Sequence, residues 1–404
     1  MAELSFCMVT TFYPPYHFGG DAMYIYRLSN ALARRGHRVS VVHSVDAYDV
    51  LSNDRPRDDF PNEPGVTVHP VRVGRGGALA TYLTGRPARN ARTLDAVFAG
   101  ERFDVVHFHN VSLIGGPGVL AYGGDAVKLY TMHEHWLVCP MHVLWKNNKE
   151  PCVDAACLRC TLTFRRPPQL WRYTGLLERE LENVDLFLSP SAFTVRAHRE
   201  RGFTRPIREL PYFLPEPPRD VVVEAAPARP YFLFVGRLEK LKGVQRLIER
   251  FRDYREADLL VVGDGQYGED LRVQAAGLDH IRFLGRVHPD ALAALYADAI
   301  ALIVPSVGYE VFGIVTLEAF ARGTPAIVRD LGALPEAVRA SGGGFVYRTE
   351  EELLEAMEAL RTDRALRDEL GRRGYEGWRE HWAEEPHLNG YFAAIDEARV
   401  LAGR

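Results

Sequence analysis

The sequence predicts an α/β protein of two domains, each a doubly wound parallel sheet, that face each other across a cleft. Its 404 residues are too many for one ordinary hydrophobic core. Near the N-terminus a strand, a glycine turn, a helix and a second strand follow one another, which is the unit of a parallel sheet. The same order restarts at Tyr231, after a proline-rich stretch. Ligands of such sheets gather at the carboxyl ends of the strands, so residues at those ends are the candidates for a site.

The first unit runs from an apolar strand at 5–10 to a second strand at 38–43. The helix between them has one apolar face and is ended by Gly36. The turn before this helix contains Gly19 and Gly20, which would leave room for a phosphate or a sugar against the backbone. A plain loop is the alternative interpretation. The pattern G-x-G-x-x-G is absent here, so the turn lacks the fingerprint of a hydride-carrying dinucleotide.

Residues 46–100 carry a weaker signal. By composition 54–64 form a charged, proline-bearing loop, and 66–73 are typical of a strand. The stretch 74–92 is basic and contains several glycines, and we interpret it as a mobile loop beside the site.

Two further strands end in histidine. The strand at 103–110 places His109 near its carboxyl end, and the strand at 127–131 is followed by His133 and His135. A single histidine at a strand end is often a hydrogen-bonded structural group. Three strand ends at one crevice, carrying Gly19-Gly20, His109 and His133, favour a functional role for His109.

Four of the five cysteines lie in one insertion, residues 139–160. Their spacing is C-x12-C-x4-C-x2-C, formed by Cys139, Cys152, Cys157 and Cys160. Four thiolates suit a tetrahedral structural zinc site, and the same spacing suits an iron–sulfur cluster. Free or disulfide-paired cysteines are the third interpretation. Because the insertion follows the strand at 127–131, we expect it to border the cleft and to take no part in the chemistry.

The first domain is expected to span residues 1–210. Its stretch 161–173 is basic with interleaved aromatic residues, which suits a solvated helix surface, anionic lipid headgroups or a phosphate-bearing acceptor. Prolines then crowd residues 211–230, which we interpret as the linker between the domains. The second domain is expected at 231–381.

The second domain repeats the plan with more charge at its strand ends. The strand at 231–235 leads into a loop at 236–243 that carries Arg237 and Lys242, two cations suited to a nucleotide diphosphate. A solvated charged loop is the alternative. The next strand runs into the tight turn Gly263-Asp264-Gly265. A short strand at 281–287, with Phe283 and Leu284, offers a backbone that could pair with the edge of a nucleobase.

The stretch 305–318 is the most informative part of this domain. A buried strand at 299–304 leads into a turn and then a helix with an apolar face. Glu310 lies in the turn and Glu318 lies about five residues into the helix, roughly 7.5 Å along its axis, so both carboxylates can face one ligand. Gly313 lets that ligand approach the backbone, and the helix start offers unpaired N–H groups. A solvated helix face is the alternative.

Composition excludes several classes of protein. A net charge of −4 with mixed signs gives no nucleic-acid footprint. No run of about 18 apolar residues is present to span a bilayer. The N-terminal residues lack the layout of a signal peptide, and an odd number of cysteines does not make a secreted disulfide framework. We therefore expect a cytoplasmic, enzyme-like chain.

Taken together, these residues resemble the retaining glycosyltransferases of family four, which have the GT-B fold of two Rossmann-like domains facing across a cleft. The resemblance implies an enzyme that moves a sugar from a nucleotide diphosphate sugar, its co-substrate, to a glycan, lipid-linked or natural-product acceptor, with retention of anomeric configuration. The matching pieces span nearly the whole chain in the family's order: Pro14-Pro15 with Gly19-Gly20, the His109 strand, Thr131-Met132-His133, Gly236-Arg237-Leu238 with Lys242-Gly243, Gly263-Asp264-Gly265, and Glu310 with Glu318.

The resemblance also implies roles for individual residues. Arg237 and Lys242 would bind the donor diphosphate, Glu318 the ribose and Glu310 the sugar hydroxyls. His109 would lie beside the anomeric centre, so the catalytic candidates are His109, Arg237, Lys242 and Glu310. The other donor-binding candidates are Gly19, Gly20, Gly236, Gly263, Gly265, Phe283, Leu284, Phe312, Gly313, Ile314, Val315 and Glu318, and the acceptor-side candidates are His17 and His133.

The family usually works without a catalytic metal, and no Asp-x-Asp metal anchor occurs in this sequence. We therefore expect no catalytic metal, with zinc at the four cysteines in a structural role. Residues 382–404 resemble the terminal helix that crosses back to the first domain. Peripheral contact with the inner face of a membrane is compatible with the stretch 161–173, and the sequence predicts no oligomeric state.

Two other functions fit a similar cleft. One is a nucleotide-sugar epimerase or hydrolase, which would consume the donor without an acceptor. The other is a non-catalytic, metal-bearing sensor of nucleotide sugars. The intact set of Arg237, Lys242, Glu310 and Glu318 argues against the sensor.

Overall fold

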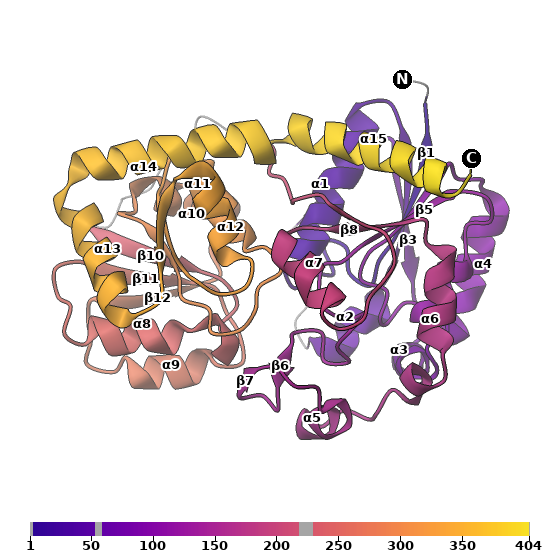
Figure 1. Cartoon of the computed structure of the whole chain (residues 1–404), viewed down its shortest axis with the longest axis horizontal. Helices are drawn as coiled ribbons and strands as arrows, with labels where there is room; N and C mark the ends of the chain where they lie inside the picture. Colours follow the sequence, from indigo (N-terminus) through magenta and orange to yellow (C-terminus); the bar gives the residue numbers. More distant parts are fainter. Residues whose placement is uncertain (1–2, 53–58, 218–228, 404) are drawn as a thin grey trace.

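The computed structural model describes residues 3–52, 59–217 and 229–403, which form two parallel sheets with helices packed against them (Figure 1). The predicted α/β class with two doubly wound sheets is confirmed. The predicted loop at 54–64 lies partly outside the described residues, and the predicted linker at 211–230 lies mostly outside them.

The first sheet has seven strands in the order β3-β2-β1-β4-β5-β8-β9. Strand β1, third in this order, is buried along its whole length, including Cys7, which is the core residue that the sequence indicates. The strands are β1 (Ser5–Val9), β2 (Arg38–Ser44), β3 (Val66–Val71), β4 (Val105–Phe108), β5 (Val127–Thr131), β8 (Leu186–Ser189) and β9 (Ile207–Glu209). The helices are α1 (Gly20–Arg34), α2 (Val45–Leu51), α3 (Arg75–Thr84), α4 (Ala91–Gly100), α6 (Leu176–Glu180) and α7 (Ala192–Arg199).

The second sheet has six strands in the order β12-β11-β10-β13-β14-β15. The strands are β10 (Tyr231–Val235), β11 (Asp258–Val262), β12 (Ile281–Gly285), β13 (Leu302–Val304), β14 (Ala326–Arg329) and β15 (Gly344–Tyr347). The helices are α8 (Val244–Phe251), α9 (Gly268–Gln274), α10 (Pro289–Asp298), α11 (Ile314–Phe320), α12 (Leu334–Ser341), α13 (Glu350–Thr362) and α14 (Arg364–Gly377).

One expectation about the first domain is wrong. Residues 74–92 are mostly helical, containing α3, a 3-10 turn and the start of α4. The glycines sit at the ends of α3, where Gly74 precedes it and Gly85 closes it in the left-handed conformation. Tyr82 fixes the helix, because its hydroxyl donates to the Pro167 carbonyl at 3.0 Å and its own carbonyl accepts from Trp171 at 2.9 Å. Tertiary packing therefore outweighs the glycine content.

The C-terminal segment connects the two domains. After α14 a π-helical turn at Trp378–Trp382 leads into α15 (Glu384–Leu401), and Figure 1 shows α14 over one domain and α15 over the other. Tyr391 of α15 is hydrogen-bonded to His107 of β4 at 2.9 Å, and Glu384 pairs with Arg34 of α1 at 2.7 Å. No helix within the described ranges is both long enough and apolar enough to cross a membrane.

Candidate active site

Two loops at the carboxyl ends of β10 and β13 bring a cation and a carboxylate into contact. The Lys242 Nζ lies 2.6 Å from Glu310 Oε1, although the two residues are 68 positions apart. The same carboxylate oxygen accepts from the Ser306 hydroxyl at 2.8 Å. Burial alone would raise the pKa of Glu310, but the Lys242 ammonium and the Ser306 hydroxyl hold this pKa below its ordinary value. Glu310 is therefore ionised at neutral pH and held in one orientation.

Arg237 lies on the same side of the second sheet but is more exposed. Its guanidinium pairs with Glu239 at 2.8 Å, two residues along the loop. The Arg237 charge also contributes to the lowered pKa of Glu310. The structure thus places both predicted cations around one carboxylate.

Some predicted ligand-side glycines are required by the fold itself. A Cβ on Gly263 would lie 1.9 Å from the Gly236 carbonyl oxygen, and one on Gly265 would lie 2.5 Å from that of Leu238. Gly243 has a φ of +78°, and a Cβ there would meet the Pro305 carbonyl at 2.1 Å. Close packing of the loops at 236–243, 263–265 and 305–306 accounts for these glycines without a ligand.

Glu318 lies on α11 and faces the first domain. Its carboxylate accepts from the Tyr296 hydroxyl at 2.9 Å and lies 4.0 Å from the Arg27 guanidinium of α1. Burial raises the pKa of Glu318, and Arg27 and Tyr296 only partly oppose this shift. Near this contact the start of α1 lies close to the start of α11, since a Cβ on Gly20 would lie 3.2 Å from the Ile314 side chain. Gly20 and Ile314, predicted from opposite domains, thus face each other.

His109 and His133 form one buried cluster. The His109 Nδ1 is 2.9 Å from the His133 Nε2, and the His133 Nδ1 is 2.6 Å from the Tyr212 hydroxyl. Burial lowers the pKa of His133 to about 4 and that of His109 well below its ordinary value, so both rings are neutral at pH 7. The Nε2 of His109 is buried and has no hydrogen-bond partner within the described part of the chain.

The first domain also supports the loop at 309–313. The Ser191 hydroxyl donates to the Val311 carbonyl at 2.6 Å, and the Tyr212 ring lies edge-on to Phe312 with 5.3 Å between centroids. The backbone N–H groups of Ala192 and Phe193, at the start of α7, donate to the Glu336 carboxylate of α12 at 3.0 and 2.7 Å. Phe312 is a predicted donor-binding residue, whereas sequence reasoning missed Tyr212 and Glu336 because these contacts depend on how the domains pack, which leaves no local signal.

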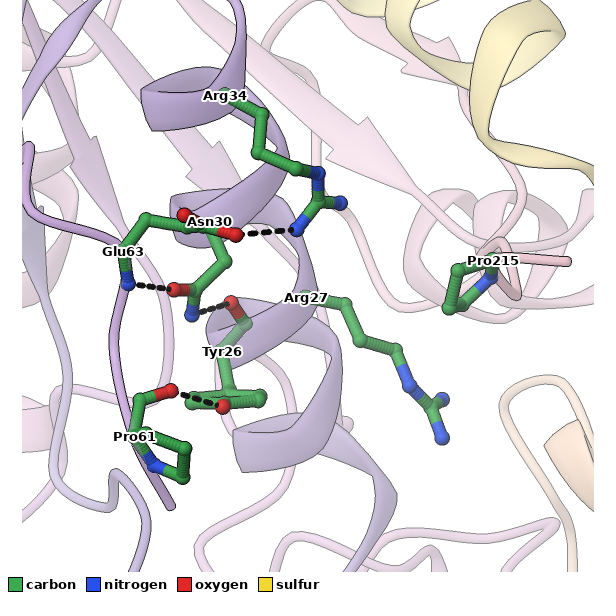
Figure 2. Close-up of a pocket in the computed structure, with 7 residues that line it drawn as sticks. All are labelled: Tyr26, Arg27, Asn30, Arg34, Pro61, Glu63 and Pro215. Carbon is green, nitrogen blue, oxygen red and sulfur yellow. Dashed lines mark hydrogen bonds and ion pairs between the residues drawn. The ribbon is translucent and has the colours of Figure 1, made fainter. Parts of the chain in front are cut away.

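A cavity of about 440 Å³ lies beside the Arg27 contact, and none of its lining residues was predicted for the site (Figure 2). The Arg27 guanidinium projects away from α1 there, while the chain at 61–63 is tied to the helix. The Tyr26 hydroxyl donates a hydrogen bond to the Pro61 carbonyl at 2.5 Å, and the Glu63 N–H donates one to the Asn30 side-chain oxygen at 2.7 Å. The cavity is lined by Tyr26, Arg27, Asn30, Arg34, Pro61, Glu63 and Pro215.

The remaining predicted residues lie apart from these contacts. Phe283 and Leu284 are on β12, the edge strand of the second sheet, where the Arg272 guanidinium lies 5.4 Å from the Phe283 ring centre. His17 is in the turn before α1 and packs edge-on against Phe60 at 5.3 Å. Gly19 immediately precedes α1 in an extended conformation.

The four cysteines gather as their spacing predicts, around a small cavity in the insertion. The zinc prediction is nevertheless not supported, and neither is the iron–sulfur alternative, since the described residues contain no group of three or more His, Cys, Asp or Glu placed to hold a metal ion. The thiols hydrogen-bond to backbone: Cys160 accepts from the Asn147 N–H at 3.3 Å, and Cys152 donates to the Asp154 carbonyl at 3.8 Å. Burial raises the pKa of Cys139 and of Cys152, which disfavours thiolates.

The basic aromatic stretch 161–173 is partly used in packing. The Arg172 guanidinium lies over the rings of Trp171 and Trp136, 4.7 and 5.2 Å from their centres, and donates to the Trp136 carbonyl at 2.8 Å. Leu170 and Tyr173 of the same stretch are exposed.

The fold and the sequence define the class of the protein as a GT-B glycosyltransferase. Residues 18–214 match the family described as Glycosyltransferase Family 4, and residues 220–377 match Glycosyl transferases group 1. A phosphatidyl-myo-inositol mannosyltransferase from Mycobacterium tuberculosis is 34% identical over 85% of this chain and 83% of that protein. The chain belongs to glycosyltransferase family four, as its motifs predict.

Other relatives are more distant in sequence but cover as much of the chain. A glycosyltransferase of uncharacterised function from Methanocaldococcus jannaschii is 27% identical over 90% of both chains. The sucrose-phosphate synthase of Thermosynechococcus elongatus has a TM-score of 0.75 at 20% identity and covers 100% of both chains. HepE of Anabaena, solved in complex with UDP and glucose, has a TM-score of 0.67 at 15% identity over 98% of this chain and 100% of that one. The two structural likenesses concern the fold alone.

Proposed function

We propose that the chain transfers a sugar from a nucleotide diphosphate sugar to an acceptor hydroxyl, with retention of anomeric configuration. The observation that carries this proposal is the Lys242–Glu310 pair with Arg237 beside it, at strand ends of the second sheet. A leaving diphosphate gains negative charge as its bond to the sugar breaks, and fixed cations in a partly buried site stabilise that charge. The structure of HepE with UDP and glucose supports a donor of this class for the fold.

The donor would lie across the second domain. Lys242 and Arg237 would contact the diphosphate, Glu310 the sugar hydroxyls and Glu318 the ribose hydroxyls. Glu310 suits its role because it is ionised and keeps one oxygen beyond the contacts to Lys242 and Ser306. The predicted contacts from the backbone N–H groups of Phe312 to Val315, and from Phe283 and Leu284 to the base, belong to the same proposal.

We propose that the first domain spans residues 1–210, the second domain 231–381 and the returning segment 382–404. The acceptor would enter from the side of the first domain. His133 uses both ring nitrogens within the protein, so we propose no direct contact between His133 and an acceptor. His17 keeps the acceptor-side role that the resemblance implies. The phosphatidyl-myo-inositol mannosyltransferase relative supports a hydroxyl-rich or lipid-linked acceptor class.

Retention requires that the acceptor attacks the face from which the diphosphate departs, or that the sugar is first transferred to the enzyme. In the first route the bond from the anomeric carbon to the phosphate oxygen breaks with its electron pair on phosphate. The acceptor oxygen bonds the same face and gives its proton to the departing phosphate. We favour this route because His109, proposed to lie beside the anomeric centre, has its polar contact with His133 and none with a carboxylate among the described residues.

The anomeric configuration of the product tests the proposal. The donor is found by thermal shift with UDP, GDP, ADP and dTDP and their sugars, since binding to the folded state raises the melting temperature. NMR of the product should then show the donor's configuration, and an inverted anomer would refute retention. Donor consumed at the same rate without acceptor would indicate the epimerase or hydrolase class. Asp21, whose charge acts on His133, is the carboxylate to test as a nucleophile: Asp21→Asn should not abolish turnover, and a glycosylated Asp21 in a mass spectrum would establish the two-step route.

A further inference from the structure

A chain of three hydrogen-bonded side chains leads from the segment joining the domains to His109. Tyr212 follows Pro211 in that segment, and its hydroxyl meets the His133 Nδ1 at 2.6 Å. The other nitrogen of His133 meets the His109 Nδ1 at 2.9 Å. All three side chains are buried, at 4%, 7% and 0% exposure for Tyr212, His133 and His109, so water does not substitute for these contacts.

Each member of the chain has a fixed number of protons. A neutral imidazole carries one N–H and one lone pair, so each histidine donates at one nitrogen and accepts at the other. Burial keeps both rings neutral by lowering the pKa of each, and it raises the pKa of Tyr212 well above its ordinary value. The Tyr212 hydroxyl therefore keeps its proton, and only two arrangements of hydrogens satisfy both bonds.

The two arrangements differ in what they leave unpaired. In the first, Tyr212 donates to His133 Nδ1, His133 Nε2–H donates to His109 Nδ1, and His109 carries its proton on Nε2. In the second, every donor reverses, and the Tyr212 hydroxyl proton then has no acceptor among the residues that the structure describes. Since His109 Nε2 has no partner in either case, the second arrangement has one more unpaired buried group. The first arrangement is therefore the stable one.

A neighbouring pair in the same aromatic cluster follows the same logic. The His387 Nδ1 is 2.8 Å from the Pro211 carbonyl oxygen, which can only accept, so His387 carries its proton there. Its Nε2 must then accept from the Tyr24 hydroxyl, 3.1 Å away. Here the backbone alone fixes a tyrosine as the donor to a histidine.

We infer that Tyr212 and His133 are positioning residues that hold His109 as the Nε2–H tautomer, so that His109 offers the substrate a hydrogen-bond donor. The ligand group that this donor would take is an oxygen with a free lone pair, such as a sugar hydroxyl or a phosphate oxygen. With this tautomer His109 is not a proton acceptor for the acceptor hydroxyl. The inference rests on the proposed function in placing His109 beside the transferred sugar.

Tyr212 also joins this chain to the donor side. Its ring lies edge-on to Phe312, next to Gly313 at the start of α11, with 5.3 Å between centroids. One side chain therefore contacts the loop proposed to hold the donor and, through His133, fixes the proton of His109. No residue of the second domain other than Phe312 is needed for this link.

The test is the tautomer of His109 in the full-length protein labelled with ¹⁵N-histidine. Long-range ¹H–¹⁵N spectra without ligand should show the Nε2–H pattern for both His109 and His133, assigned by the signals lost in His109→Asn and His133→Asn. An Nδ1–H pattern for His109 in the wild-type protein would overturn the inference, whether or not any variant folds.

Tyr212→Phe removes the donor at the head of the chain and keeps the ring. We expect His109 to become a mixture of tautomers, with kcat falling by the same factor as the Nε2–H fraction and the donor KM unchanged. Tyr24→Phe is the matched control, since it removes a buried tyrosine–histidine bond nearby and should leave the His109 pattern and kcat unchanged. An unchanged His109 pattern in Tyr212→Phe would overturn the positioning role. If the tautomers behave as expected but no donor sugar is transferred, the proposed function fails and the tautomer assignment stands.

Discussion

Lys242→Met is the perturbation that tests the candidate donor site most directly. Methionine keeps the length of the apolar stem of this side chain, which is 20% exposed, and removes the ammonium that lies 2.6 Å from Glu310. Two losses follow: the contact from Lys242 to a donor phosphate, and the neutralisation of Glu310 beside that phosphate. A hydrogen bond to a charged group contributes about 1.5 to 3 kcal/mol.

These values set the expected size of the effect. At about 1.4 kcal/mol per factor of ten, the loss of one such contact weakens nucleotide diphosphate binding roughly tenfold to 150-fold. The roughly tenfold effect is expected if Lys242 contacts the diphosphate while it remains paired with Glu310, so that only a shared contact is lost. The roughly 150-fold effect is expected if Glu310, once unpaired, also repels the diphosphate. In that case the double variant Lys242→Met/Glu310→Gln should bind the diphosphate more tightly than Lys242→Met alone.

The assay is isothermal titration calorimetry with the nucleotide diphosphate that stabilises the wild-type protein. Lys240→Met is the matched control, because Lys240 is in the same loop but lies over the Tyr267 ring and makes no contact with Glu310. We expect the control to bind within about twofold of wild type, as is typical of a surface charge. Wild-type affinity in a folded Lys242→Met would refute the placement of the diphosphate at this loop.

Three further predictions follow from the charges and the buried rings. The pKa of Glu310 is lowered in the folded state, so its ionised form stabilises the fold above pH 4.5. The difference in unfolding free energy between wild type and Glu310→Gln should therefore shrink as the pH falls below 4.5. Urea unfolding at pH 6 and pH 3.5 measures this difference, and an equal difference at both pH values would contradict the prediction. His109→Ala should lower kcat by about 100-fold or more while nucleotide affinity stays within about twofold, and a loss of affinity instead would move His109 to the binding side. Four buried histidines stay neutral in the folded state down to about pH 4, whereas in the unfolded chain they take up protons below pH 6.5; they are His43, His133, His198 and His387. The free energy of unfolding should therefore fall as the pH drops from 6.5 to about 4. A flat profile over this range would show that these rings are accessible to protons in the folded protein.

Local patterns predicted the architecture because a parallel sheet repeats a short unit. Apolar runs marked the strands, and glycine turns marked where each strand ends and a helix begins. The stretch 305–318 and the loop at 236–243 were assigned to one site on this basis, since carboxyl ends of parallel strands share an edge. The direct contact of Lys242 with Glu310 was not predicted, because strand order and loop conformation decide it.

The errors and omissions have separate physical causes. The glycine content of residues 74–92 predicts a loop, but Gly74 and Gly85 lie at the two ends of α3 and cap it. The zinc prediction used spacing, which brings cysteines near one another but does not fix the directions of their sulfur atoms. Arg27 and Glu336 carry no motif at all, and they acquire a role only when the second domain packs against the first; Tyr212 also carries no motif and acquires its role from the buried contact with His133.

The Glu318 carboxylate belongs both to the contact between the two domains and to the proposed donor site. In the free protein this carboxylate is half-buried and has a raised pKa; it accepts from the Tyr296 hydroxyl at 2.9 Å and lies 4.0 Å from the Arg27 guanidinium. Ribose hydroxyls would supply hydrogen bonds that Arg27 does not, and a donor held there would change the free energy of the contact between α1 and α11. Because coupling between two binding events is reciprocal, the packing of the first domain on α11 would in turn change the affinity for a donor held there. A donor bound as proposed would therefore be coupled to the arrangement of the two domains through Glu318, the residue that would recognise the ribose.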